Sequence, residues 1–197
     1  MTNNENLIIE THPWPPFIPE GAKVLLMGTF PPGEHRWSMD FYYPNPTNDF
    51  WRIMSLLFLG DKNALYDAKT KKFDLERVRC LASDNHIALN DTAREIRRLK
   101  GNASDKFLEI LKPVPLLDLL TKMPECHDVA TTGEKAAGVI ASLTSTEVPR
   151  MGEFTMADGI RYWRMPSTSR AYPMKLEVKA EYYRKLFIAA GILPPET

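Results

Sequence analysis

The chain has 197 residues, of which 44% are hydrophobic and 25% are charged, and its formal net charge is +0. This length suits one domain with a full hydrophobic core, and the composition is typical of globular rather than disordered proteins. A protein with no net charge exerts no long-range attraction on nucleic acid. A site for a polyanion would therefore have to come from a local patch or from backbone amides.

Targeting and metal-binding signals are weak along the whole chain. No apolar run approaches the roughly 20 residues that cross a bilayer, and the first residues lack a signal-peptide pattern. We therefore expect a cytoplasmic protein that does not bind a membrane. Cys80 and Cys126 belong to no metal-binding motif. We expect two unpaired thiols, no metal and no cofactor.

The first segment, residues 1–22, is rich in proline, as in "HPWPPFIPEG". Proline favours extended chain, so we predict an extended arm over 1–22, followed by a single α/β domain over 23–197. Four apolar segments of this domain predict strands, at 23–28, 86–91, 127–133 and 160–169. Their continuous hydrophobicity suits strands that are buried on both faces of a parallel sheet.

Helical patterns lie between these strands, at 47–58, 74–85, 104–111, 115–123, 133–143 and 175–191. Thr47 and Asn48 are candidate N-caps of the first helix, Ser104 is one for the third, and Gly191 ends the last. The alternation predicts a three-layer α/β/α sandwich with a central, mostly parallel four-stranded sheet. We expect a monomer, because these layers need no partner chain to cover them.

All four predicted strands end in polar residues, within "GTFPP", "LNDT", "TTG" and "MPSTSR". The carboxyl ends of parallel strands meet at one edge of a sheet, where open α/β folds bind their ligands. The loop after the first strand adds an aromatic run, "FYYPNPTNDFW", that leads into the first predicted helix. Together these segments predict a ligand site at this edge of the sheet.

The same segments resemble the uracil-DNA glycosylase superfamily, and within it they are most similar to the hypoxanthine (deoxyinosine) DNA glycosylases. "GTFPP" looks like the first motif of that subgroup, "NPTNDFW" like the helix start after it, and "MPSTS" like its second motif. The resemblance covers residues 12–55 and 160–170. It implies a monofunctional glycosylase that hydrolyses the N-glycosidic bond of a deaminated base, uracil or hypoxanthine, flipped out of DNA.

Two other interpretations stay open. The first is a catalytically weak or inactive nucleic-acid-binding module of the same fold. The second is a small-molecule hydrolase or nucleotide-binding protein, although "GTFPP" lacks the lysine of a phosphate-binding P-loop and the chain has no G-x-S-x-G motif.

The resemblance also implies roles for particular side chains. Tyr43 and Phe30 would lie at the base, with Tyr43 stacked on it, although Tyr42 and Tyr43 could instead cover the core. Asn90 would read the base edge through its amide, or it could simply cap a strand end. Phosphate would be held by hydroxyls, backbone N–H groups and one guanidinium, or some of these could cap their own turn. The residues concerned are Thr132, Ser167, Thr168, Ser169 and Arg170.

The group that would activate water departs from the superfamily pattern. Many relatives have aspartate or asparagine two residues after the first-motif glycine, where this chain has Phe30. Most have histidine or asparagine before the "PS" of the second motif, where this chain has Met165. In the hypoxanthine subgroup the asparagine of the helix start is catalytic instead, and it corresponds to Asn48. An amide can position water but cannot act as a base, and Asn48 could equally be a helix cap.

Asp40 is the second catalytic candidate, acting by its charge or as a base. His35 and Asp91 are further polar contributors, and each of these side chains could be an ordinary loop residue. Because no motif fixes a strong acid or base, we expect a slow enzyme, one with a narrow substrate range, or a protein that has lost catalysis.

Overall fold

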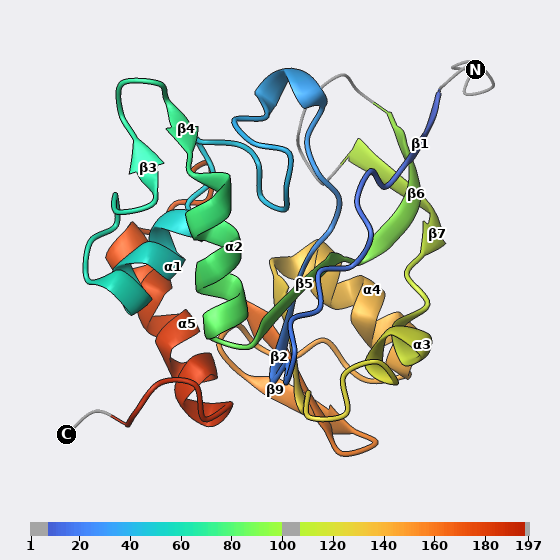
Figure 1. Ribbon diagram of the computed structural model, residues 1–197. Coiled ribbons are helices and arrows are strands. Elements are labelled where there is room, and N and C mark those ends of the chain that lie inside the picture. Colours follow the sequence, from blue (N-terminus) through green and yellow to red (C-terminus); the bar gives the residue numbers. More distant parts are fainter. Residues whose placement is uncertain (1–7, 100–106, 196–197) are drawn as a thin grey trace.

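The computed structural model describes residues 8–99 and 107–195, and a sheet of five strands lies at its centre (Figure 1). The strand order is β5-β2-β8-β10-β9. Four strands run parallel: β2 (Val24–Gly28), β5 (Ile87–Asp91), β8 (Asp128–Thr132) and β10 (Ile160–Met165). Every residue of β2, β5 and β8 is buried, as their continuous hydrophobicity predicts.

The predicted number of strands in this sheet is wrong, because a fifth strand, β9 (Phe154–Ala157), pairs antiparallel with β10. The two strands are joined by Asp158 and Gly159, both with positive φ, at 50° and 78°. An Asp-Gly pair favours this kind of tight hairpin turn, so the sequence carried the signal. β10 also ends earlier than predicted, at Met165, because Pro166 has no N–H to continue the ladder.

Helices cover both faces of the central sheet (Figure 1). One face packs against α1 (Phe50–Leu59), α2 (Leu75–Asp84) and α5 (Leu176–Ala189), and the other against α3 (Leu116–Leu120) and α4 (Glu134–Thr144). The predicted three layers are therefore present. α1 ends at Gly60, whose φ of 73° is the left-handed conformation that glycine adopts without strain. No helix in the described part of the chain is long and apolar enough to span a membrane.

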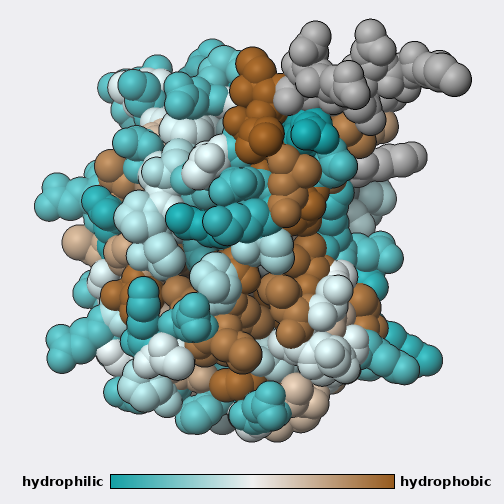
Figure 2. Space-filling model, turned by 90° about the vertical axis from the view of Figure 1, so that its right-hand side faces the viewer, coloured by the Kyte–Doolittle hydropathy of each residue, from teal (hydrophilic) through white to brown (hydrophobic). Residues whose placement is uncertain are grey.

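A second, antiparallel sheet has the order β1-β6-β7 and consists of β1 (Ile9–Thr11), β6 (Ala93–Arg98) and β7 (Leu108–Pro113). The predicted helix over 104–111 is wrong, because its second half is β7, and Ser104 lies outside the described residues. Leu108 is buried and Glu109 exposed, an alternation that matches a strand with one covered face. Figure 2 views the molecule from this side and shows apolar side chains among the polar ones.

The remaining elements lie in connections. A 3-10 turn, η2 (Glu34–Arg36), follows β2, and a short hairpin of β3 (Tyr66–Asp67) and β4 (Lys72–Phe73) follows α1. The proline-rich segment contributes β1 and then runs along the central sheet, where the backbone of Phe17 pairs with that of Leu89.

Candidate functional site

A cavity of about 710 Å³ opens at the carboxyl edge of the parallel strands. Its walls include Gly28 at the end of β2, Asp91 at the end of β5 and Thr132 at the end of β8. The rest of the wall comes from the loop between β2 and α1 and from the loop after β10. A volume of this size is typical of sites for small molecules, so a single nucleobase has room here.

Most of the predicted site residues line this cavity. They come from segments far apart in the sequence, and they are Phe30, Tyr43, Asn48, Thr132, Ser167, Thr168, Ser169 and Arg170. Asp40 and Asn90 are not among the lining residues. His35 lies in a neighbouring, shallower hollow that it shares with Lys71 and Lys72.

Tyr43 is held rigidly at the cavity wall. Its φ is 52°, its ring stacks on Phe50 with centroids 3.6 Å apart and planes 8° apart, and its hydroxyl lies 3.3 Å from Thr132 Oγ1. Burial and the nearby negative charge of Asp91 raise the pKa of the Tyr43 phenol well above its usual range. The phenol therefore stays protonated at neutral pH. Phe50 covers one face of the Tyr43 ring, so only the rest of the Tyr43 side chain can line the cavity.

Asn90 faces the interior rather than the cavity. Its side chain is 1% exposed, and its Oδ1 lies 3.1 Å from the Tyr42 hydroxyl, which is also 3.0 Å from the Pro15 carbonyl oxygen. Successive side chains of a strand point to opposite sides, so the next residue, Asp91, reaches the cavity instead. Asn90 therefore does not line the cavity with the other predicted site residues, and Tyr42 lies in the core.

Asp40 also lies away from the cavity. Its exposed carboxylate accepts a hydrogen bond of 2.7 Å from the Trp14 indole nitrogen, which ties the proline-rich arm to the loop before α1. The structure gives this carboxylate a role in joining two segments and places it off the cavity wall.

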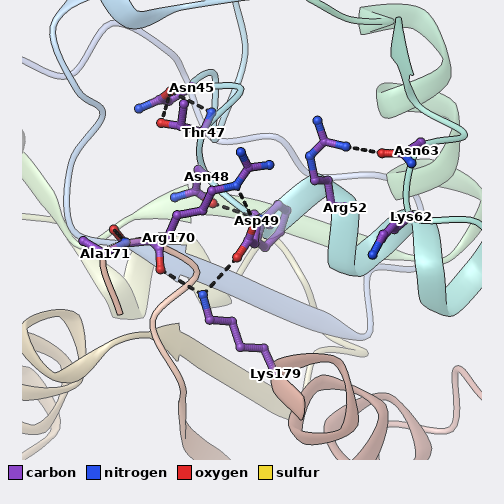
Figure 3. Close-up of polar contacts among 12 residues, drawn as sticks. Asn45, Thr47, Asn48, Asp49, Arg52, Lys62, Asn63, Arg170, Ala171 and Lys179 are labelled. Carbon is purple, nitrogen blue, oxygen red and sulfur yellow. Dashed lines mark hydrogen bonds and ion pairs between the residues drawn. The ribbon is translucent and has the colours of Figure 1, made fainter. Parts of the chain in front are cut away.

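Asn48 lines the cavity, and its side chain caps the first N–H of α1, although the N-cap residue by position is Asp49 rather than the predicted Thr47 or Asn48. Its Oδ1 accepts the N–H of Phe50 at 2.8 Å, and its backbone forms an isolated bridge with Ser169. Figure 3 shows the amide beside Asp49 and Arg170. The carbonyl end of the amide is thus engaged with the start of α1. The amide nitrogen, which only donates, is the end left to meet a ligand.

A buried ion cluster fixes the loop after β10 against α1 and α5 (Figure 3). Lys179, which is 0% exposed, donates to Asp49 Oδ2 at 3.0 Å and to the Ser169 carbonyl oxygen at 2.8 Å. Arg170 Nε donates to Asp49 Oδ1 at 2.9 Å, and the Asp49 N–H to the Thr168 carbonyl at 2.8 Å. Neither Asp49 nor Lys179 was predicted from the sequence as a site residue. The available signal was a lysine within the apolar stripe of a helix, four residues before Tyr183.

The hydroxyl-bearing loop is partly engaged with itself. Ser167 Oγ accepts the Ser169 N–H at 3.3 Å, and Ser169 Oγ accepts the Ala171 N–H at 3.2 Å. Each serine still has a hydroxyl proton to donate. Thr168 is buried and contributes its carbonyl to α1, whereas 47% of the Arg170 side chain is exposed at the rim. Local capping and a ligand-binding role are thus compatible in this loop.

Asp91 is the one carboxylate among the described residues that line the cavity. It is joined to His12 of the arm, which no sequence motif indicated. In the part of the chain that the structure describes, no group of three histidine, cysteine, aspartate or glutamate side chains is placed to hold a metal ion.

Fold and cavity together define a parallel α/β sandwich whose ligand site, ringed by aromatic and hydroxyl-bearing loops, lies at the carboxyl edge of the sheet. No protein-family model matches the chain, and no curated protein matches its sequence.

Among solved structures, the chain is similar to the solution NMR structure of a protein from Methanosarcina acetivorans that is described as a candidate uracil DNA glycosylase. The TM-score is 0.64 and the identity 20%, over 90% of this chain and 99% of that chain. The similarity supports the predicted α/β fold, and the resemblance to the superfamily stays a prediction. The narrower resemblance to the hypoxanthine subgroup stays a prediction.

Proposed function

We propose that this chain is a monofunctional DNA glycosylase that hydrolyses the N-glycosidic bond of a deaminated base, uracil or hypoxanthine, flipped out of DNA. The observation that carries the proposal is the convergence of Tyr43, Asn48 and the loop 167–170 on one cavity at the strand ends. Shared fold with a candidate uracil DNA glycosylase supports the same reading.

Each part of the cavity suits one demand of the reaction. An extruded base lies against the Tyr43 ring, where stacking on an aromatic contributes about 1–3 kcal/mol. The Asn48 amide nitrogen donates to a carbonyl oxygen, which uracil and hypoxanthine both carry. The hydroxyls of Ser167 and Ser169 and the guanidinium of Arg170 hold the flanking phosphates. Such local contacts bind DNA although the net charge of the chain is +0.

The enzyme is monofunctional in this proposal because no described residue lining the cavity is a lysine that could form a Schiff base with the sugar. Lys179 lies nearby, but its amino group is buried and paired with Asp49. The protein acts as a monomer on DNA, and the proposed reaction needs only water besides the substrate.

The test is a panel of oligonucleotide duplexes with uracil, hypoxanthine, xanthine or thymine opposite guanine, scored for alkali-labile abasic sites. We expect excision of uracil or hypoxanthine, and thymine serves as the undamaged control. If none of the four bases is released, the proposed activity is wrong.

The second candidate function is that of a nucleic-acid-binding module with the same fold that does not catalyse base excision. Phe30 and Met165 favour it, because neither side chain can activate water or stabilise a departing base. Gel-shift binding to uracil or inosine duplexes without alkali-labile breaks would establish this alternative.

A further inference from the structure

The end of β5 carries an acid that the motifs did not assign. Asp91 is paired in register with Gly28 at the end of β2, and its carboxylate reaches across that glycine toward the cavity. A Cβ atom added at Gly28 would lie 2.6 Å from Asp91 Oδ1 and 3.5 Å from the Tyr43 hydroxyl. Absence of a side chain at Gly28 is thus what lets Oδ1 occupy this position beside Tyr43.

His12 holds the other oxygen of this carboxylate. His12 Nε2 lies 2.9 Å from Asp91 Oδ2, and both side chains are almost completely buried, at 1% and 8% exposure. On the far side of the ring, Nδ1 lies 3.0 Å from the Trp14 carbonyl oxygen and 3.2 Å from the Trp14 nitrogen. When Nδ1 accepts the Trp14 N–H, the neutral ring carries its proton on Nε2 and donates it to Asp91.

The surroundings of His12 fix the ring. Trp14, Phe30 and Tyr42 pack around it with ring centroids 5.7, 5.4 and 5.6 Å away. No hydrogen bond from the described residues reaches Asp91 Oδ1. One carboxylate oxygen is therefore anchored by the histidine, and the other is available to the cavity.

Phe30 lies on the cavity wall and packs edge-on against the His12 ring, and its side chain can neither orient nor deprotonate water. Asn48 cannot act as a base either, because an amide does not take up a proton near neutral pH and its oxygen already caps α1. Asp91, at the end of the neighbouring strand β5, is the carboxylate that can take up a proton at this cavity.

We propose that Asp91 is the catalytic carboxylate of this cavity and that His12 is its positioning residue, an inference that rests on the proposed glycosylase function. Asp91 Oδ1 accepts a proton from the attacking water as the water oxygen forms a bond to C1′ of the sugar. The bond between C1′ and the base nitrogen breaks, and its electron pair leaves with the base. Asp91 then returns the proton through solvent to that nitrogen, giving a C1′ hydroxyl and a neutral base.

The principal test is Asp91→Asn, which keeps an acceptor for His12 and removes the base. We expect single-turnover excision to fall by about 10²–10⁴-fold, the usual contribution of a positioned general base, with duplex binding and thermal midpoint little changed. A matched control is Asp84→Asn, an exposed aspartate at the end of α2, at the opposite edge of the same sheet. It should excise at the wild-type rate.

Two further variants protect the test against a folding defect. Gly28→Ala retains Asp91 but forces Oδ1 from its position, and a misplacement of about 1 Å can cost about 100-fold in rate. His12→Ala should slow excision in the wild-type background and add no further loss in the Asp91→Asn background, because the histidine acts through the carboxylate.

The outcomes separate the two proposals. If wild type releases a base and a folded Asp91→Asn or Gly28→Ala variant releases it as fast, Asp91 is not catalytic and the glycosylase function stands. Additive losses from His12→Ala and Asp91→Asn would overturn the positioning role of His12. If wild type releases no base from any duplex, the proposed function fails, and the role of Asp91 fails with it.

Discussion

Two walls of the cavity are each built on a buried aspartate, and the two aspartates differ in how many of their oxygens are taken. On one wall, Arg170 and Lys179 occupy both oxygens of Asp49. On the other, His12 occupies one oxygen of Asp91 and leaves the second toward the cavity. The first carboxylate can only hold the loop after β10 in place, whereas the second can also react. A carboxylate with both oxygens hydrogen-bonded is structural, whereas one with a free oxygen facing the cavity is a catalytic candidate.

The largest effect, a loss of stability, is expected from Lys179→Met, which removes one of the two cations that bind Asp49. The substitution leaves Asp49 buried with Arg170 as its remaining cation, and removing one partner of a buried ion pair typically costs about 3–5 kcal/mol. Urea denaturation measures the free energy of unfolding. Lys62→Met is the control, because the pair between Lys62 and Glu177 is largely exposed and should contribute far less. Equal losses in the two variants would refute the structural role of the Asp49 cluster.

Tyr43 stands between the two walls, and Tyr43→Ala tests whether the cavity receives a base. Loss of the ring should weaken binding of a duplex with an extruded base by about 1–3 kcal/mol. Tyr43→Phe keeps the ring and removes only the contact with Thr132 Oγ1, so its affinity should stay close to wild type. Fluorescence titration with uracil and hypoxanthine duplexes provides both values. Equal affinity of Tyr43→Ala and wild type would make the ring a cover for the core.

Asn48 is on the same wall as Asp49, and two substitutions separate its two ends. Asn48→Ala removes the cap of α1, which should cost about 1 kcal/mol of stability, together with the amide donor. Asn48→Asp keeps an acceptor for the Phe50 N–H, removes the amide donor and adds a negative charge beside Asp49 and Arg170. We expect both variants to lose excision and only the alanine variant to lose the capping energy, as measured by single-turnover kinetics and urea denaturation. Excision at the wild-type rate by both would show that Asn48 is a cap alone.

The smallest effect is expected from Arg170→Ala at the rim. About half of this side chain is exposed, so its pair with Asp49 contributes little to stability, and its charge is available to phosphate. Removing one phosphate contact should reduce the slope of log affinity against log salt by about 1. Lys122→Ala removes the same charge at the exposed end of α3 and should leave that slope unchanged. An unchanged slope for Arg170→Ala would assign Arg170 to the structural cluster only.

The strands β2, β5 and β8 could be predicted because they are buried on both faces, and continuous hydrophobicity suits that environment. The antiparallel sheet could not be recognised in the same way. β6 and β7 bury one face, so charged residues such as Glu95 and Glu109 alternate with apolar ones and hide the strands. The error over 104–111 follows from this one-sided burial.

The residues of the site were predictable to the extent that they lie in one motif or at one strand end. Asn90 and Asp91 are adjacent, and the sequence does not say which of the two side chains points into the cavity. The His12 contact joins residues separated by 79 positions in the chain, and only the folded arm brings them together. Lys179 likewise meets Asp49 across 130 positions. Pairs of this kind depend on tertiary geometry that no local pattern encodes.

The route of the arm makes the proposed role of Asp91 dependent on an intact segment at the edge of the domain. His12 is linked to β6 through the Arg94 carbonyl, and the chain then crosses exposed Pro13 and Pro15 before Phe17 pairs with Leu89. A single proteolytic nick within 13–16 would break the covalent link between His12 and the part of the arm that pairs with β5, while sparing the parallel strands. Under the proposed mechanism, clipped material would keep its circular dichroism spectrum and excise more slowly, so preparations should be judged by intact mass.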